Sequence, residues 1–87
     1  MMARIIHAAG GDSALDLPMQ NQLEHLQKAV GGYIEVVPST QDGYSIVCNE
    51  EGKLNNLPIN YKATMLHWHH SDPLCGDVVI IRTNELN

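Results

Sequence analysis

The stretch Asp77-Val78-Val79-Ile80-Ile81-Arg82-Thr83 decides the fold of this chain. A strand with one face in water alternates apolar and polar residues, whereas Val78 to Ile81 is apolar without interruption. That pattern is typical of a strand that is buried on both faces. We therefore predict that residues 77–83 form a central strand, with other strands on either side.

Four earlier segments are predicted to supply the neighbouring strands, because each is rich in β-forming residues and ends at a turn signal. These segments are 4–8, 14–17, 33–37 and 44–49. Gly10-Gly11-Asp12 separates the first two as a hairpin turn, and Asp42-Gly43 supports a second hairpin between the other two.

An amphipathic helix is predicted between the two hairpins. The apolar residues Met19, Leu23, Leu26 and Val30 recur at helical spacing, and Gly31-Gly32 ends the element because glycine adopts the left-handed conformation easily.

Residues 54–59 are expected to form an ordered loop or a short edge segment. Asn60 is a predicted N-cap for a short helix over 61–67. The expected fold is a single α+β domain over 1–87, ordered β-β-α-β-β-(α)-β, with one main helix on a mixed or antiparallel sheet.

Composition limits the classes of partner. The chain has 87 residues, no phenylalanine and a net charge of −5, so we expect a thin core that gains from a subunit interface, and hence a homo-oligomer. Five permanent cations are too few to grip duplex nucleic acid, although one or two can hold the phosphates of a small nucleotide. The longest apolar run, Val78 to Ile81, is too short to cross a membrane.

Cysteine usage and the first residues indicate the compartment. Cys48 and Cys75 have no short metal-binding spacing, and nothing before Ala9 resembles a secretory leader. We expect reduced thiols and a cytoplasmic protein with no cofactor.

Several polar and aromatic residues are candidates for binding the phosphate, base and sugar of a nucleotide. Lys53 and Lys62 would take phosphate, while Trp68 and Tyr33 would stack on a base. The sugar or other polar edges would fall to Asn49, Asn60, Thr64 and His69. Each also has a structural reading: Asn60 as a helix cap, Thr64 as helix surface, Tyr33 as a strand residue and Asn49 as part of a solvated turn.

The segment His67-Trp68-His69-His70 offers a metal site as an alternative. Three imidazoles supply enough nitrogen donors for zinc. In one regular element, however, only two of them share a face: His67 and His70 on a helix, or His67 and His69 in a strand. No recognisable catalytic motif occurs, so an enzyme is not the leading interpretation.

Several segments together resemble a family of small domains of unknown function from phages, plasmids and other mobile elements of bacteria. They are Leu26–Val37, Asn49–Leu54, Leu57-Pro58 with Asn60 and Ala63-Thr64, and Gly76–Ile80. The resemblance covers nearly the whole chain, but His67–His70 is not part of the pattern and the family implies no catalytic residues. By size and setting the chain also resembles phage proteins that sequester nucleotide immune signals, and this resemblance implies a location in the cytoplasm of a bacterial host cell.

The leading hypothesis is therefore a small binding protein that sequesters a nucleotide-derived immune signal, a cyclic nucleotide or an ADP-ribose derivative, without cleaving it. One alternative is a protein–protein interaction module that binds a host factor through the Trp68 region. The other is a metal-dependent phosphodiesterase that uses His67, His69 and His70.

Overall fold

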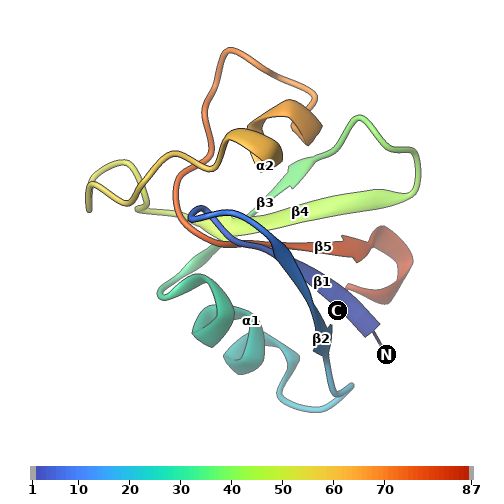
Figure 1. Ribbon diagram of the computed structural model, residues 1–87. Coiled ribbons are helices and arrows are strands. Elements are labelled where there is room, and N and C mark those ends of the chain that lie inside the picture. Colours follow the sequence, from blue (N-terminus) through green and yellow to red (C-terminus); the bar gives the residue numbers. More distant parts are fainter. Residues whose placement is uncertain (1, 87) are drawn as a thin grey trace.

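Five strands form one antiparallel sheet in the computed structural model, which describes residues 2–86 (Figure 1). The strands are β1 (Met2–Ile6), β2 (Asp12–Asp16), β3 (Ile34–Pro38), β4 (Tyr44–Asn49) and β5 (Val78–Arg82). Their order across the sheet is β2-β1-β5-β4-β3. The last strand in the sequence thus lies at the centre, between the two hairpins, as its uninterrupted apolar residues predict.

The sheet is covered on both faces. Val79 and Ile81 of β5 pack with Leu26 of helix α1 (Gln22–Val30) on one face. Val78 packs with Ala63 of helix α2 (Tyr61–Leu66) and with Leu74 on the other. Figure 1 shows the two helices on opposite sides of the sheet. The predicted α+β fold is confirmed, and it has two small cores, one on each face of β5.

The predicted start of the main helix is wrong, and its predicted buried face is confirmed at Leu26 and Val30 but wrong at Met19 and Leu23. Asn21 has a left-handed backbone (φ 58°), so α1 begins at Gln22 and not at Met19. Gln22, Leu26 and Val30 form the buried stripe, whereas Leu23 is 56% exposed and Met19 64% exposed. The side-chain amide of Gln22 donates to Glu85 O (2.9 Å), which makes its burial possible. The predicted C-terminal end at Gly31 is confirmed.

The first hairpin is also displaced from its prediction. β1 ends at Ile6 and β2 begins at Asp12, because Ile6 and Asp12 are paired in the sheet. The connection is a five-residue turn in which the His7 amide donates to Gly11 O (3.0 Å). Compared with the predicted strands 4–8 and 14–17, β1 ends two residues earlier and β2 begins two residues earlier, because Ala8 belongs to the turn and Asp12 to the strand.

The segments around α2 complete the second face. Asn60 is the N-cap of α2, since its Oδ1 accepts from the Ala63 amide (3.0 Å). Ile59 and Cys75 form an isolated bridge, so 54–59 is an ordered loop that touches the strand-like segment before β5. A 3₁₀ helix follows β5 at Thr83–Glu85. None of the helices in residues 2–86 has the length and apolar character needed to cross a membrane.

Candidate functional site: a pocket on the α2 face

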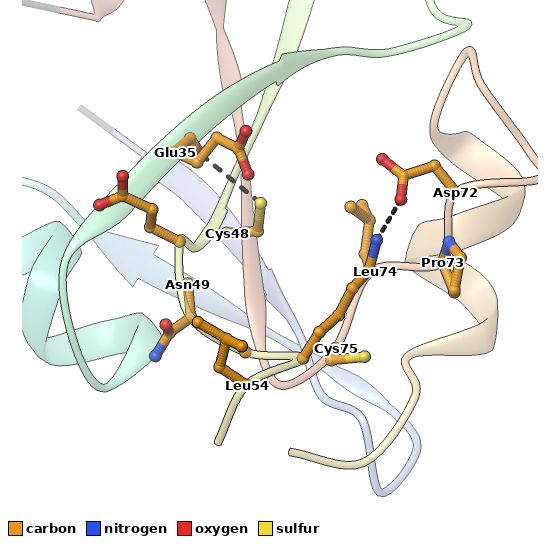
Figure 2. Close-up of a pocket in the computed structure, with 11 residues that line it drawn as sticks. Glu35, Cys48, Asn49, Leu54, Asp72, Pro73, Leu74 and Cys75 are labelled. Atoms are coloured by element: carbon orange, nitrogen blue, oxygen red, sulfur yellow. Dashed lines mark hydrogen bonds and ion pairs between the residues drawn. The ribbon is translucent and has the colours of Figure 1, made fainter. Parts of the chain in front are cut away.

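A pocket of about 290 Å³ lies on the α2 face, between the β3–β4 hairpin and two loops. Figure 2 shows Glu35 and Asp72 on opposite sides of it, with the Cys48 sulfur between them. The turn that follows β4 contributes Gly52, Lys53 and Leu54, and the segment before β5 contributes Asp72, Pro73, Leu74 and Cys75. The pocket is therefore built by segments that are far apart in the sequence.

A close backbone contact holds the two loops together. A Cβ atom on Gly52 would lie 2.8 Å from Cys75 O, a distance that real Cβ atoms essentially never show. Glycine is needed here for the space that it leaves. Asn49 fixes the start of the same turn: its Nδ2 donates to Val30 O (3.1 Å) and its Oδ1 accepts from the Glu51 amide (2.8 Å).

The inner wall of the pocket holds a protonated thiol. Burial, and next the negative charge of Glu35, raise the pKa of Cys48 to about 12. The Cys48 Sγ–H points to Glu35 O at 3.6 Å. A thiol that stays neutral at physiological pH is a poor nucleophile and a poor metal ligand, so Cys48 serves as apolar wall.

Charge gathers at the rim. Lys53 Nζ forms an ion pair with Asp72, and both side chains are about half exposed. Their hydrogen bond raises the pKa of Lys53 and lowers the pKa of Asp72. Glu35 and Glu50 add two carboxylates. The pocket thus combines an apolar wall, one exposed cation and several hydrogen-bond acceptors.

Comparison with protein families shows which family the chain belongs to. The family described as domain of unknown function DUF3846 matches residues 3–87. The chain belongs to this family. Comparison with curated proteins and with solved structures finds no match. Membership confirms the resemblance to a family of small domains of unknown function over nearly the whole DUF3846 chain. The link to phages and mobile elements stays a prediction, and the roles of single residues rest on the geometry of the structure.

Like Asn49, the predicted ligand residues Asn60 and Thr64 have their polar groups bound within the DUF3846 fold. Asn60 is 1% exposed, and its Nδ2 donates to Ile6 O (2.9 Å) and Gly76 O (3.0 Å). Thr64 Oγ1 donates to Asn60 O (2.8 Å) and accepts from the Leu74 amide (3.0 Å). Both residues tie α2 to the segment that walls the pocket.

Of the predicted ligand residues, the pocket brings together Asn49 and Lys53. Lys62 lies on α2 and pairs with Asp12 at 3.3 Å. Tyr33 is 67% exposed and lines a second cavity at the end of α1, which Asn49 also lines. Trp68 is 61% exposed and meets His69 edge to face, with ring centroids 5.8 Å apart. The ligand roles of these side chains stay predictions.

The three histidines of 67–70 have different surroundings. His67 is buried, and its Nδ1 bonds to Asp72 O (3.1 Å). His69 is exposed, with its Nδ1 3.0 Å from Ser71 Oγ, and His70 is exposed as well. Within residues 2–86 no group of three or more His, Cys, Asp or Glu side chains is placed to hold a metal ion. The geometry therefore gives no support to the metal alternative.

Sequence reasoning missed Glu35, Asp72 and Leu74 as pocket residues. Glu35 carries one available signal, since it is the one charged residue in the otherwise apolar segment 34–38. Asp72 and Leu74 carry none, because they reach the pocket only through the path of the 67–77 loop.

Proposed function

We propose that this DUF3846 domain is a small binding protein that holds a nucleotide-derived ligand in the α2-face pocket and does not cleave it. The observation that supports this proposal is the combination of Lys53, the carboxylates Glu35 and Glu50, and an apolar wall in one cavity. A nucleotide presents phosphate, hydroxyl groups and a flat base. A cation can bind the phosphate, carboxylates can accept from the hydroxyl groups, and an apolar wall can cover the base.

Lys53 would exchange one partner for another. Its pair with Asp72 is exposed, and such pairs contribute little to stability, so the ammonium group can turn from Asp72 to a phosphate at low cost. Carboxylates accept hydrogen bonds from ribose hydroxyls. The base would lie against Leu54 and Leu74; Leu54 is 80% exposed and would lose contact with water on binding.

The proposed role of this binding is to sequester an immune signal. A small domain that retains a cyclic nucleotide or an ADP-ribose derivative intact would remove an immune signal from a bacterial cell. Such a role fits a phage or mobile-element protein. The segment that carries Trp68 and His69 adjoins the pocket, because the Asp72 amide donates to His69 O (3.0 Å), and it provides an aromatic surface for a ligand that extends beyond the cavity.

Replacing Lys53 by alanine is expected to weaken ligand retention by about 1.5 to 3 kcal/mol, the usual contribution of a hydrogen bond to a charged group. The measurement is incubation with a bacterial nucleotide extract, removal of unbound material, heat release and chromatography. Lys28→Ala is the matched control, since Lys28 is exposed on α1 and lies outside the pocket. Release of an intact nucleotide supports the proposal. A hydrolysed product indicates an enzyme, and retention of no nucleotide contradicts binding.

We also propose that the domain forms a homodimer through the edge strand β3. Pro38 O accepts from the Trp68 amide (3.3 Å) and Ser39 bridges to His67, so one end of β3 is covered within the chain. The edge at Ile34–Val36 is open in residues 2–86, and an open edge pairs readily with another strand. Beside it lie the exposed side chains of Met19, Leu23 and Val36.

A two-fold axis at Val36 would pair the β3 strands of two copies antiparallel and bring their apolar patches together. Light scattering at micromolar concentration should then give twice the mass of one chain, and Val36→Lys should give a monomer. Tyr61→Lys is the control, because Tyr61 is 74% exposed on the opposite face of the sheet. A monomeric wild-type protein would contradict the dimer.

A further inference from the structure

Three side chains at one end of the sheet form a continuous hydrogen-bonded array. Ser13 Oγ lies 2.9 Å from His7 Nε2, and His7 Nδ1 lies 3.1 Å from Asp77 Oδ2. The other carboxylate oxygen, Asp77 Oδ1, accepts from the Ala8 amide (2.9 Å). The array is separate from the α2-face pocket, whose lining includes none of these residues.

The sheet itself sets the geometry. Ser13 is in β2, His7 follows β1 and Asp77 precedes β5, and these three strands are neighbours. Ile6 pairs with Val78, so His7 and Asp77 are the next facing positions along the same ladder. Ile5 pairs with Ser13, and His7 shares the face of Ile5 because side chains alternate along a strand. The three groups therefore meet on the α1 face.

The hydrogen bonds also determine the histidine tautomer. An ionised carboxylate can only accept, so in the neutral imidazole Nδ1 carries the proton and Nε2 presents a lone pair to the Ser13 hydroxyl. A nucleophile hydrogen-bonded to a base, with the base oriented by a third group, is the arrangement that activates serine for covalent catalysis. Ser13 is exposed, and the His7 side chain is 36% exposed, so a substrate can reach both.

We propose that Ser13 is the nucleophile of an acyl-transfer site, with His7 as its general base and Asp77 as the positioning residue for the imidazole. A cavity of about 310 Å³ begins at Asp77 and Ala8, beside the array. Its lining is mainly apolar, with Ala29, Val30 and Leu57, and it includes Lys28. This surrounding fits a carboxylic ester with a small apolar body.

The reaction conserves atoms and charge with water as the only co-reactant. Ser13 Oγ attacks the ester carbonyl carbon while its proton passes to His7 Nε2. The bond from that carbon to the alcohol oxygen then breaks, and the alcohol leaves with the proton from Nε2. A water molecule attacks the acyl-serine in the same way, so that the acid is released and the Ser13 hydroxyl is restored.

The test uses 4-nitrophenyl acetate and the full chain. Wild-type protein should release 4-nitrophenolate and gain one acetyl group, which peptide mass spectrometry places on Ser13. Ser13→Ala should remove this adduct, and His7→Gln should slow acetylation about 100-fold, within the range that a general base contributes. Ser71→Ala is the control. Ser71 also contacts a histidine, at 3.0 Å from His69 Nδ1, but that pair has no carboxylate partner among the hydrogen bonds and ion pairs of residues 2–86.

Asp77→Asn separates positioning from structure. An asparagine Oδ1 can still accept from the Ala8 amide, but its Nδ2 donates to His7 Nδ1 and moves the ring proton to Nε2, where it blocks the base. Thermal stability should change little, whereas Ser13 acetylation should fall about 100-fold. Acetylation of lysines or Ser71 in place of Ser13, no acetylation at all, or an unchanged rate in folded Asp77→Asn or His7→Gln would each overturn the proposal.

Discussion

Replacing Asn60 by alanine is expected to destabilise the domain by about 3 to 5 kcal/mol. The substitution removes the cap of α2, which contributes about 1 kcal/mol. It also leaves the buried Ile6 O and Gly76 O without the Nδ2 donor that now satisfies both, and a buried polar group without a partner costs about 1 to 3 kcal/mol. Because domains are stable by only about 5 to 15 kcal/mol, this loss is a large part of the total.

Urea unfolding followed by circular dichroism measures the effect, and Asn55→Ala is the matched control because Asn55 is exposed in a turn. Asn60→Asp distinguishes the cap from the two longer-range bonds. Aspartate caps helices as well as asparagine does, but its carboxylate would face two carbonyl oxygens with no proton to donate. We therefore expect Asn60→Asp to be strongly destabilised too. A stable Asn60→Asp variant would show that only the cap matters.

Asn60 also shows why part of the site could be predicted from the sequence and part could not. Its cap contact spans three residues, and such a local contact follows from residue type and position. Its bonds to Ile6 and Gly76 span 54 and 16 residues and depend on the path of the whole chain. The ligand role assigned to Asn60 from the sequence competes with these bonds, which already use its amide.

The central strand could be predicted because the evidence for it is contained in four consecutive apolar residues, Val78 to Ile81. The structure adds what each residue faces: Val79 and Ile81 belong to the α1 core, and Val78 belongs to the α2 core. The pocket and the serine array depend on longer paths. Lys53 and Asp72 are 19 residues apart, and His7 and Asp77 are 70 apart. No spacing rule connects such positions.

The second large effect is expected at Leu26. Leu26→Ala should cost about 2 to 5 kcal/mol, the range for buried leucines, because Leu26 is 1% exposed in the α1 core. Each kcal/mol lowers the midpoint of a domain of this size by roughly 4 to 8 °C, so thermal unfolding should move by about 8 °C or more. The sequence pattern placed Leu23 in the same buried stripe, whereas the structure leaves it 56% exposed.

Leu23→Ala therefore serves as both control and test of the helix register. The two substitutions make the same change in the same helix, so their helix propensities change alike and only burial differs. In dilute protein we expect Leu23→Ala to stay within about 0.5 kcal/mol of wild type. Equal losses of stability in Leu23→Ala and Leu26→Ala would instead support the buried helix face that the sequence predicts from Met19 onward. A loss at Leu23 that grows with protein concentration would have another cause, since a dimer through β3 would bury Leu23 only in the paired state.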